Sequence, residues 1–120
     1  MLQHDVLKHD PQIMTKMQRE QFSEEGCHVL EGIIDEMWLN RLRSAMDEMI
    51  DASRQVAESD AQFVLEEGHS QDDPRLRRLS RPVAHHPTFW EFASNSKIVD
   101  VAADVCGPDV KFHHSKLNFK

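Results

Sequence analysis

Cationic and amide side chains alternate with apolar ones near residues 110–120, a stretch that reads as an extended strand. Successive side chains of a strand point to opposite faces, so one face carries a polar row made of His114, Lys116, Asn118 and Lys120. The other face ends in Leu117 and Phe119. Lysine binds a carboxylate as a point charge, so such a row on a cavity wall suits an anionic ligand. The alternative is a solvated edge strand with ordinary surface lysines.

Four arginines form a basic cluster within an acidic chain: Arg75, Arg77, Arg78 and Arg81. One interpretation is that they recruit an anionic substrate or co-substrate at the mouth of a cavity. The alternative is that they are surface residues paired with a nearby acidic stretch, which contains Glu66, Glu67, Asp72 and Asp73. The sequence leaves both interpretations open.

The histidine pairs suggest a metal site, but their spacing opposes it. His113 and His114 are neighbours on the predicted strand, so their rings would point to opposite faces and could not chelate one ion. His86 precedes Pro87 and more plausibly forms the entry to a helix. No Ser-His-Asp or Cys-His arrangement, phosphate-binding glycine loop or zinc spacing is recognisable. We therefore assign no residue as a metal ligand or as catalytic.

The elements that would position these side chains begin with a polar lead-in over residues 1–14, which is expected to be loose. Thr15 suits the N-cap of a short helix over residues 15–25, which Gly26 would end. The clearest helix opens at Asp35, and its apolar positions repeat at helical intervals as far as Ile50. This Met-rich stripe could be a binding groove, but a packed core face is the favoured interpretation.

Shorter elements are expected in the second half of the chain. Residues 62–66 predict a strand, and residues 67–74 predict a loop. Pro87 suits the first turn of a helix. Ser94 or Asn95 could cap a second helix, which Gly107 and Pro108 would stop. Helices and short strands in this order predict an α+β fold.

The composition limits the function classes. With 120 residues, 39% of them hydrophobic and 29% charged, the chain has room for one soluble globular domain. A formal charge of -7 opposes nucleic acid or an anionic membrane as the main partner, and no apolar stretch approaches bilayer length. Cys27 and Cys106 lie far apart beside apolar residues, so buried free thiols are expected and a reducing cytoplasm fits best.

Several segments together resemble the phytanoyl-CoA dioxygenase family. They are FSEEGCHVLEG with the amphipathic helix after it, RRLSRPVAHHPTFWEF, CGPDVKF and HHSKLNFK. The resemblance implies that residues 15–120 supply the N-terminal helices and first strands of a double-stranded β-helix, a jelly-roll or cupin-like fold that is incomplete here. It also implies an oxygenase that uses Fe(II) and 2-oxoglutarate to hydroxylate an aliphatic C–H bond of a small molecule.

The resemblance also implies roles for individual residues. The family's His-x-Asp…His iron triad would fall beyond Lys120, so the chain alone is expected to be inactive. Co-substrate binding falls to Lys120 and Lys116, and substrate-facing positions are His114, Asn118, Arg78 and Arg81. Whether the full protein hydroxylates or halogenates depends on a position outside this chain. An alternative from another class is a non-catalytic helical module whose Met-rich face or arginine cluster binds a partner protein.

Overall fold

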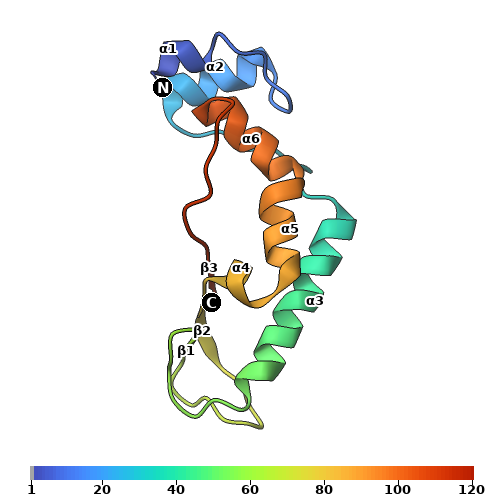
Figure 1. Cartoon of the computed structure of the whole chain (residues 1–120), viewed down its shortest axis with the longest axis vertical. Coiled ribbons are helices and arrows are strands. Elements are labelled where there is room, and N and C mark those ends of the chain that lie inside the picture. Colours follow the sequence, from blue (N-terminus) through green and yellow to red (C-terminus); the bar gives the residue numbers. More distant parts are fainter. Residues whose placement is uncertain (1) are drawn as a thin grey trace. The chain divides into compact units, whose positions relative to one another are not determined.

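The structure, a computed structural model, describes residues 2–120 (Figure 1). These residues form two compact units. The first unit comprises the described residues up to Asp35 together with Phe92–Phe112, and the second comprises Glu36–Glu91 together with His113–Lys120. The elements in chain order are α1 (Gln3–Val6), α2 (Lys16–Glu25), α3 (Glu36–Ser53), β1 (Phe63–Leu65), β2 (Leu76–Ser80), α4 (Pro82–His85), α5 (Pro87–Asn95), α6 (Lys97–Cys106) and β3 (Lys116–Asn118).

Helix α2 of the first unit begins and ends where the sequence predicts. The Thr15 hydroxyl accepts a hydrogen bond from the Gln18 N–H at 3.1 Å, and the Gln18 side chain accepts one from the Thr15 N–H at 2.9 Å. This reciprocal pair is a capping box, which satisfies donors that the first turn leaves open. Gly26 ends the helix with a φ of 78°, a left-handed conformation that glycine adopts without strain.

Helix α6 starts slightly later than the sequence suggests. Its N-cap is Ser96, whose hydroxyl accepts a hydrogen bond from the Ile98 N–H at 3.3 Å, so the prediction of Ser94 or Asn95 is wrong. All three residues are good N-caps, and α5 continues through Asn95 before the chain can turn. Gly107 ends α6 as predicted.

The expectation of a loose lead-in over residues 1–14 is wrong for the part that the structure describes. Gln3–Val6 form α1, and Val6 and Met14 are 6% and 4% exposed. The segment is ordered by partners on α2 and α6, one of them about ninety residues further along the chain. A local sequence pattern carries no information on such distant contacts.

Helix α3 of the second unit uses its Met-rich stripe as a core face, as predicted. Ala45 is 1% exposed, and Leu42, Met49 and Ile50 pack against a buried cluster. The other members of that cluster come from the sheet and from α5: Phe63, Leu76, Leu79 and Phe89. The alternative interpretation of the stripe as an open binding groove is therefore not favoured.

Three short strands form an antiparallel sheet in the order β1-β2-β3. The predicted strand over residues 62–66 is confirmed as β1, and helices with a small sheet confirm the α+β class. On β1, Val64 pairs with Arg78 but Leu65 pairs with Leu76, so Arg77 has no opposite residue. This extra residue in β2 is a bulge, which lets Leu76 and Leu79 both reach the core.

The strand expected over residues 110–120 is much shorter in the structure, where only Lys116–Asn118 form a paired strand. The partner strand limits it, because β2 ends at Ser80 and the chain then turns into α4. Arg81 makes this turn with a φ of 50°, and Pro82 occupies the first turn of α4. The residues ahead of Lys116 therefore face no strand with which they could pair.

Candidate anion-binding site

The two faces of the sheet differ sharply in chemistry. Leu79 on β2 lies between Phe63 on β1 and Leu117 on β3, and these side chains belong to the core. Neighbouring residues on a strand point to the opposite face, so Arg78 and Ser80 of β2 lie there. Their partners on β3 are Asn118 and Lys116, both exposed. The structure thus brings together three predicted site residues, which are Arg78, Lys116 and Asn118.

Two apolar residues, one within β3 and one just after it, hold this arrangement in place. Leu117 and Phe119 are half-buried and pack against the core cluster, and the Phe119 N–H donates a hydrogen bond to the Arg77 carbonyl at 3.0 Å. If β3 slipped by one residue against β2, both apolar side chains would be exposed to water and Lys116 would face the core. Burial of Leu117 and Phe119 therefore fixes the polar row on the outer face.

The arginine cluster divides into two pairs with different surroundings. The Arg77 guanidinium donates to both carboxylate oxygens of Glu66, at 3.0 and 2.9 Å, and Arg75 pairs with Asp73 at 2.9 Å. The hydrogen bonds from Arg77, and then one from the Glu67 backbone, hold the pKa of Glu66 below its usual value. For Arg75 and Arg77, pairing with the acidic stretch is therefore confirmed.

Arg78 and Arg81 behave differently, because neither has a carboxylate partner within residues 2–120. Arg78 is half-buried, and its Nε is buried without a hydrogen-bond partner among the described atoms. A buried donor that lacks an acceptor destabilises a protein and often marks a place where a ligand or water binds. Because no carboxylate of the described residues pairs with it, Arg78 adds a positive charge to this face, opposite Asn118 and diagonal to Lys116.

Arg81 adopts an unfavourable backbone conformation. It is the single non-glycine residue with positive φ among the described residues, and its exposed side chain makes no capping hydrogen bond. A left-handed conformation costs a residue with a side chain about 1 kcal/mol. The Arg81 N–H donates to the Ser115 carbonyl at 3.2 Å, which ties this turn to the residue before β3. The turn therefore keeps Arg81 at the end of the polar face.

The structure does not bring the other two predicted residues into the row by strand pairing. Lys120 follows β3 and is exposed. His114 lies ahead of β3 in irregular chain, and its ring meets the ring of His113 edge-on, with 4.6 Å between centroids. The prediction that these two rings point to opposite faces is wrong, since it assumed a strand that does not extend to them.

Ser80 is a member of the polar face that the sequence interpretation missed. It lies opposite Lys116 and two residues after Arg78, so both share a face of β2. The signal was available in the spacing, because residues two apart on a strand point the same way. The arginine cluster, considered without its strand, gives no reason to include Ser80.

The His86 side chain has a structural role that accounts for both ring nitrogens. Its Nδ1 accepts a hydrogen bond from the Thr88 N–H at 3.2 Å at the start of α5, so Nδ1 carries no proton. Its Nε2 then donates to the Glu48 carboxylate at 2.7 Å. The prediction that His86 forms a helix entry is confirmed. Within residues 2–120, no group of three or more His, Cys, Asp or Glu side chains could hold a metal ion.

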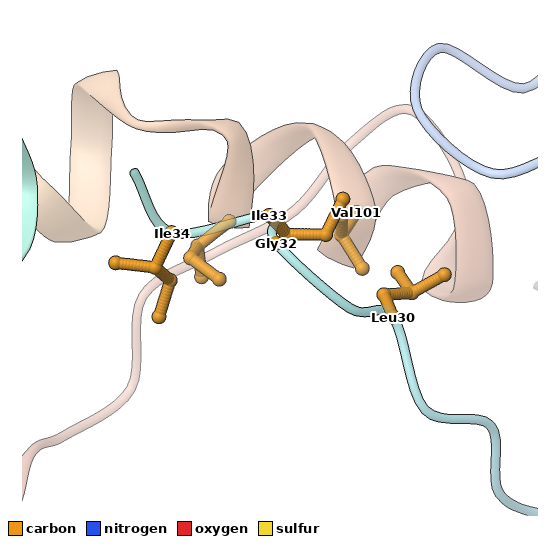
Figure 2. Close-up of a pocket in the computed structure, with 6 residues that line it drawn as sticks. Leu30, Gly32, Ile33, Ile34 and Val101 are labelled. Atoms are coloured by element: carbon orange, nitrogen blue, oxygen red, sulfur yellow. The ribbon is translucent and has the colours of Figure 1, made fainter. Parts of the chain in front are cut away.

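A further hollow lies in the first unit and is apolar. Figure 2 shows Leu30, Ile33 and Ile34 of one loop beside Val101 of α6. These residues line a hollow of about 290 Å³. Gly32 and Ile98 complete its lining. These side chains include no titratable group, so this hollow has no chemistry that would recognise an anion.

Comparison with known proteins adds no assignment. No family model, no curated protein and no solved structure matches this chain. Among the described helices, none combines the length and the apolar character needed to cross a membrane.

The start of β1 gives a pH-dependent prediction. The Asp60 carboxylate accepts hydrogen bonds from the N–H groups of Phe63 and Gln62, at 2.7 and 2.8 Å. These bonds, the Phe63 bond foremost, hold its pKa below the usual 3.8. A lowered folded-state pKa stabilises the fold above pH 3.8, and this contribution is lost as the pH falls through the folded-state value.

We expect Asp60→Asn, which keeps the acceptor oxygen but removes the charge, to unfold at a lower urea concentration than the unmodified chain at about pH 7. The difference should shrink below about pH 4, as the native carboxylate also becomes neutral. Urea titrations at several pH values measure it. A difference that stays constant or widens in acid would contradict the assignment.

Proposed function

We propose that this chain supplies the N-terminal helices and pocket-wall strands of an Fe(II)- and 2-oxoglutarate-dependent oxygenase. The observation that carries the proposal is the polar outer face of the sheet, where Arg78 and Lys116 lie on adjacent strands without carboxylate partners. A sheet with one face packed on a helix and a cationic face beyond it suits the wall of a double-stranded β-helix. The resemblance to phytanoyl-CoA dioxygenases supports the same interpretation.

The charges and spacing of this face suit a dicarboxylate such as 2-oxoglutarate. Arg78 is directly opposite Asn118, and Lys116 lies on the diagonal from Arg78, a Cα separation of about 7–8 Å on a sheet. A lysine ammonium attracts a carboxylate as a point charge, whereas a guanidinium offers directed donors. Lys120 is proposed as a second cation for the same ligand. His114, Asn118, Arg78 and Arg81 are the proposed contacts for the substrate.

The described residues fit the co-substrate but not the metal. Iron in this family needs two histidines and a carboxylate held together, and no such cluster exists within residues 2–120. The resemblance places these ligands outside the chain. When bound, the iron would supply the oxidising chemistry that hydroxylates an aliphatic C–H bond. For this chain, binding of 2-oxoglutarate is therefore the activity to measure, and turnover is not expected.

Titrating 2-oxoglutarate into the full chain tests the proposal, with the backbone amide NMR shifts of β2 and β3 as the readout. We expect saturable binding that Lys116→Glu weakens about tenfold or more. Reversing the charge replaces an attraction of about 1 kcal/mol or more by a repulsion of similar size. Lys97→Glu is the matched control, because it makes the same charge change at an exposed residue of α6 in the other unit.

Two results would contradict the proposal. One is the absence of shift changes on β2 and β3 at millimolar 2-oxoglutarate. The other is an equal loss of binding in Lys97→Glu, which would indicate attraction to overall charge and no defined site. A parallel titration with succinate, which has two carboxylates but no keto group, shows whether the keto group contributes to binding.

A further inference from the structure

Residues 2–14 are bound by a buried carboxylate on α6. Asp104 is 2% exposed, and its two oxygens accept three backbone hydrogen bonds, from Gln12 at 2.7 Å, Ile13 at 2.9 Å and Met14 at 2.8 Å. Bonds to a charged acceptor are stronger than those between neutral groups. These three successive amides thus form a nest that encloses one carboxylate.

A buried cation on α2 binds the same segment a few residues earlier. Arg19 is 4% exposed, and its Nη2 donates to the Leu7 carbonyl at 3.1 Å and to the His9 carbonyl. A buried charge is strongly unfavourable unless hydrogen bonds satisfy it. Backbone atoms of residues 7–14 satisfy both Asp104 oxygens and the Arg19 Nη2, whereas the Arg19 Nε is buried without a hydrogen-bond partner among the described atoms. The segment is therefore recognised through its backbone conformation more than through its side chains.

The segment adds little apolar packing of its own. Val6 and Met14 are its buried apolar side chains, whereas Leu2 and Leu7 are 66% and 38% exposed. Between the segment and the helices beneath it lies a cavity of about 460 Å³. Its lining includes Val6 and Leu7 from the segment, Phe22 from α2 and Val105 from α6. Detaching the segment would therefore expose few buried apolar side chains and would open this cavity.

We propose that residues 2–14 form a strap that detaches from α2 and α6 as one unit while both units of the chain stay folded, and that Asp104 is its main attachment. The free energy needed to open a region with few buried apolar contacts is lower than the free energy of global unfolding. On opening, water resolvates Asp104, Arg19 and the freed amides, which lowers the cost of breaking the bonds. This inference is independent of the proposed oxygenase function, since it concerns no residue of the sheet.

Amide hydrogen exchange on the full chain tests the strap. In the unmodified chain, the amides of Gln12, Ile13 and Met14 should exchange together, and faster than the amides of α3 and β2. In Asp104→Asn their exchange should accelerate about tenfold or more, since a charged acceptor for three bonds is lost. The matched control is Asp100→Asn, which removes the same charge from the same helix one turn earlier.

The strap is supported if exchange accelerates at residues 12–14 in Asp104→Asn while the amides of α3 and β2 keep their rates and Asp100→Asn has no such effect. It is overturned if the rates at residues 12–14 do not change, or if Asp100→Asn accelerates them equally. Should Asp104→Asn fail to fold, the denaturant dependence of exchange in the unmodified chain decides. If the amides of residues 12–14 then exchange only through global unfolding, the strap proposal is overturned.

Discussion

Replacing Leu79 with alanine should lower the free energy of unfolding by about 3 kcal/mol. Leu79 is 0% exposed on the central strand, between Phe63 on one side and Leu117 on the other. Alanine would leave a cavity where sheet, α3 and α5 meet, and the surrounding main chain of the strands cannot collapse into it. Urea denaturation followed by circular dichroism gives the value.

Leu39→Ala is the matched control, since it removes the same atoms from a residue of α3 that is 36% exposed. Its expected cost is below about 1 kcal/mol, because water already reaches that side chain. Similar losses in the two variants would show that Leu79 is not the centre of the core. Burial of Leu79 would then not explain why Arg78 and Ser80 lie on the outer face of the sheet.

Replacing His69 with alanine should destabilise the chain by about 2 kcal/mol, because three backbone groups would lose one shared partner. The His69 Nδ1 accepts a hydrogen bond from the Arg75 N–H at 2.9 Å, so the proton is on Nε2. Nε2 then donates to the carbonyls of Ser53 and Val56, at 3.1 and 3.0 Å. The ring thus joins the end of α3 to the loop that leads into β2.

His113→Ala provides the comparison, because His113 is an exposed histidine of the same unit whose ring contacts that of His114. Its urea midpoint should remain close to that of the unmodified chain. The His69 assignment fails if the two alanine variants are equally stable. Such a result would mean that water replaces the ring at little cost.

The longer helices of this chain were largely readable from sequence, whereas α1 and α4 were not. The Thr15 capping box, the stop at Gly26 and the stripe of α3 depend on residues within a few positions of one another. Rules based on capping and period use that short range, and so they succeed here. The same rules misplaced the start of α6 only slightly, since several good caps occur in succession before it.

The candidate site was readable in part. Alternation correctly placed Lys116 and Asn118 on the face opposite Leu117, because a period of two is a property of any strand. It wrongly extended the strand to His113 and His114, because the length of a strand depends on its partner. Arg78 was a candidate from the cluster alone, and its position beside Asn118 could not be inferred.

Sequence by itself determined the helix boundaries near strong caps, the core stripe of α3 and the alternation of polar and apolar residues at Lys116 and Asn118. Tertiary structure alone decided which arginines pair with Glu66 and Asp73, and which one lies across from Asn118. It also decided that Asp104 binds the amides of residues 12–14. The physical reason is range, since caps and periods act between near neighbours, whereas register, ion pairing and burial join residues that only the folded chain brings together.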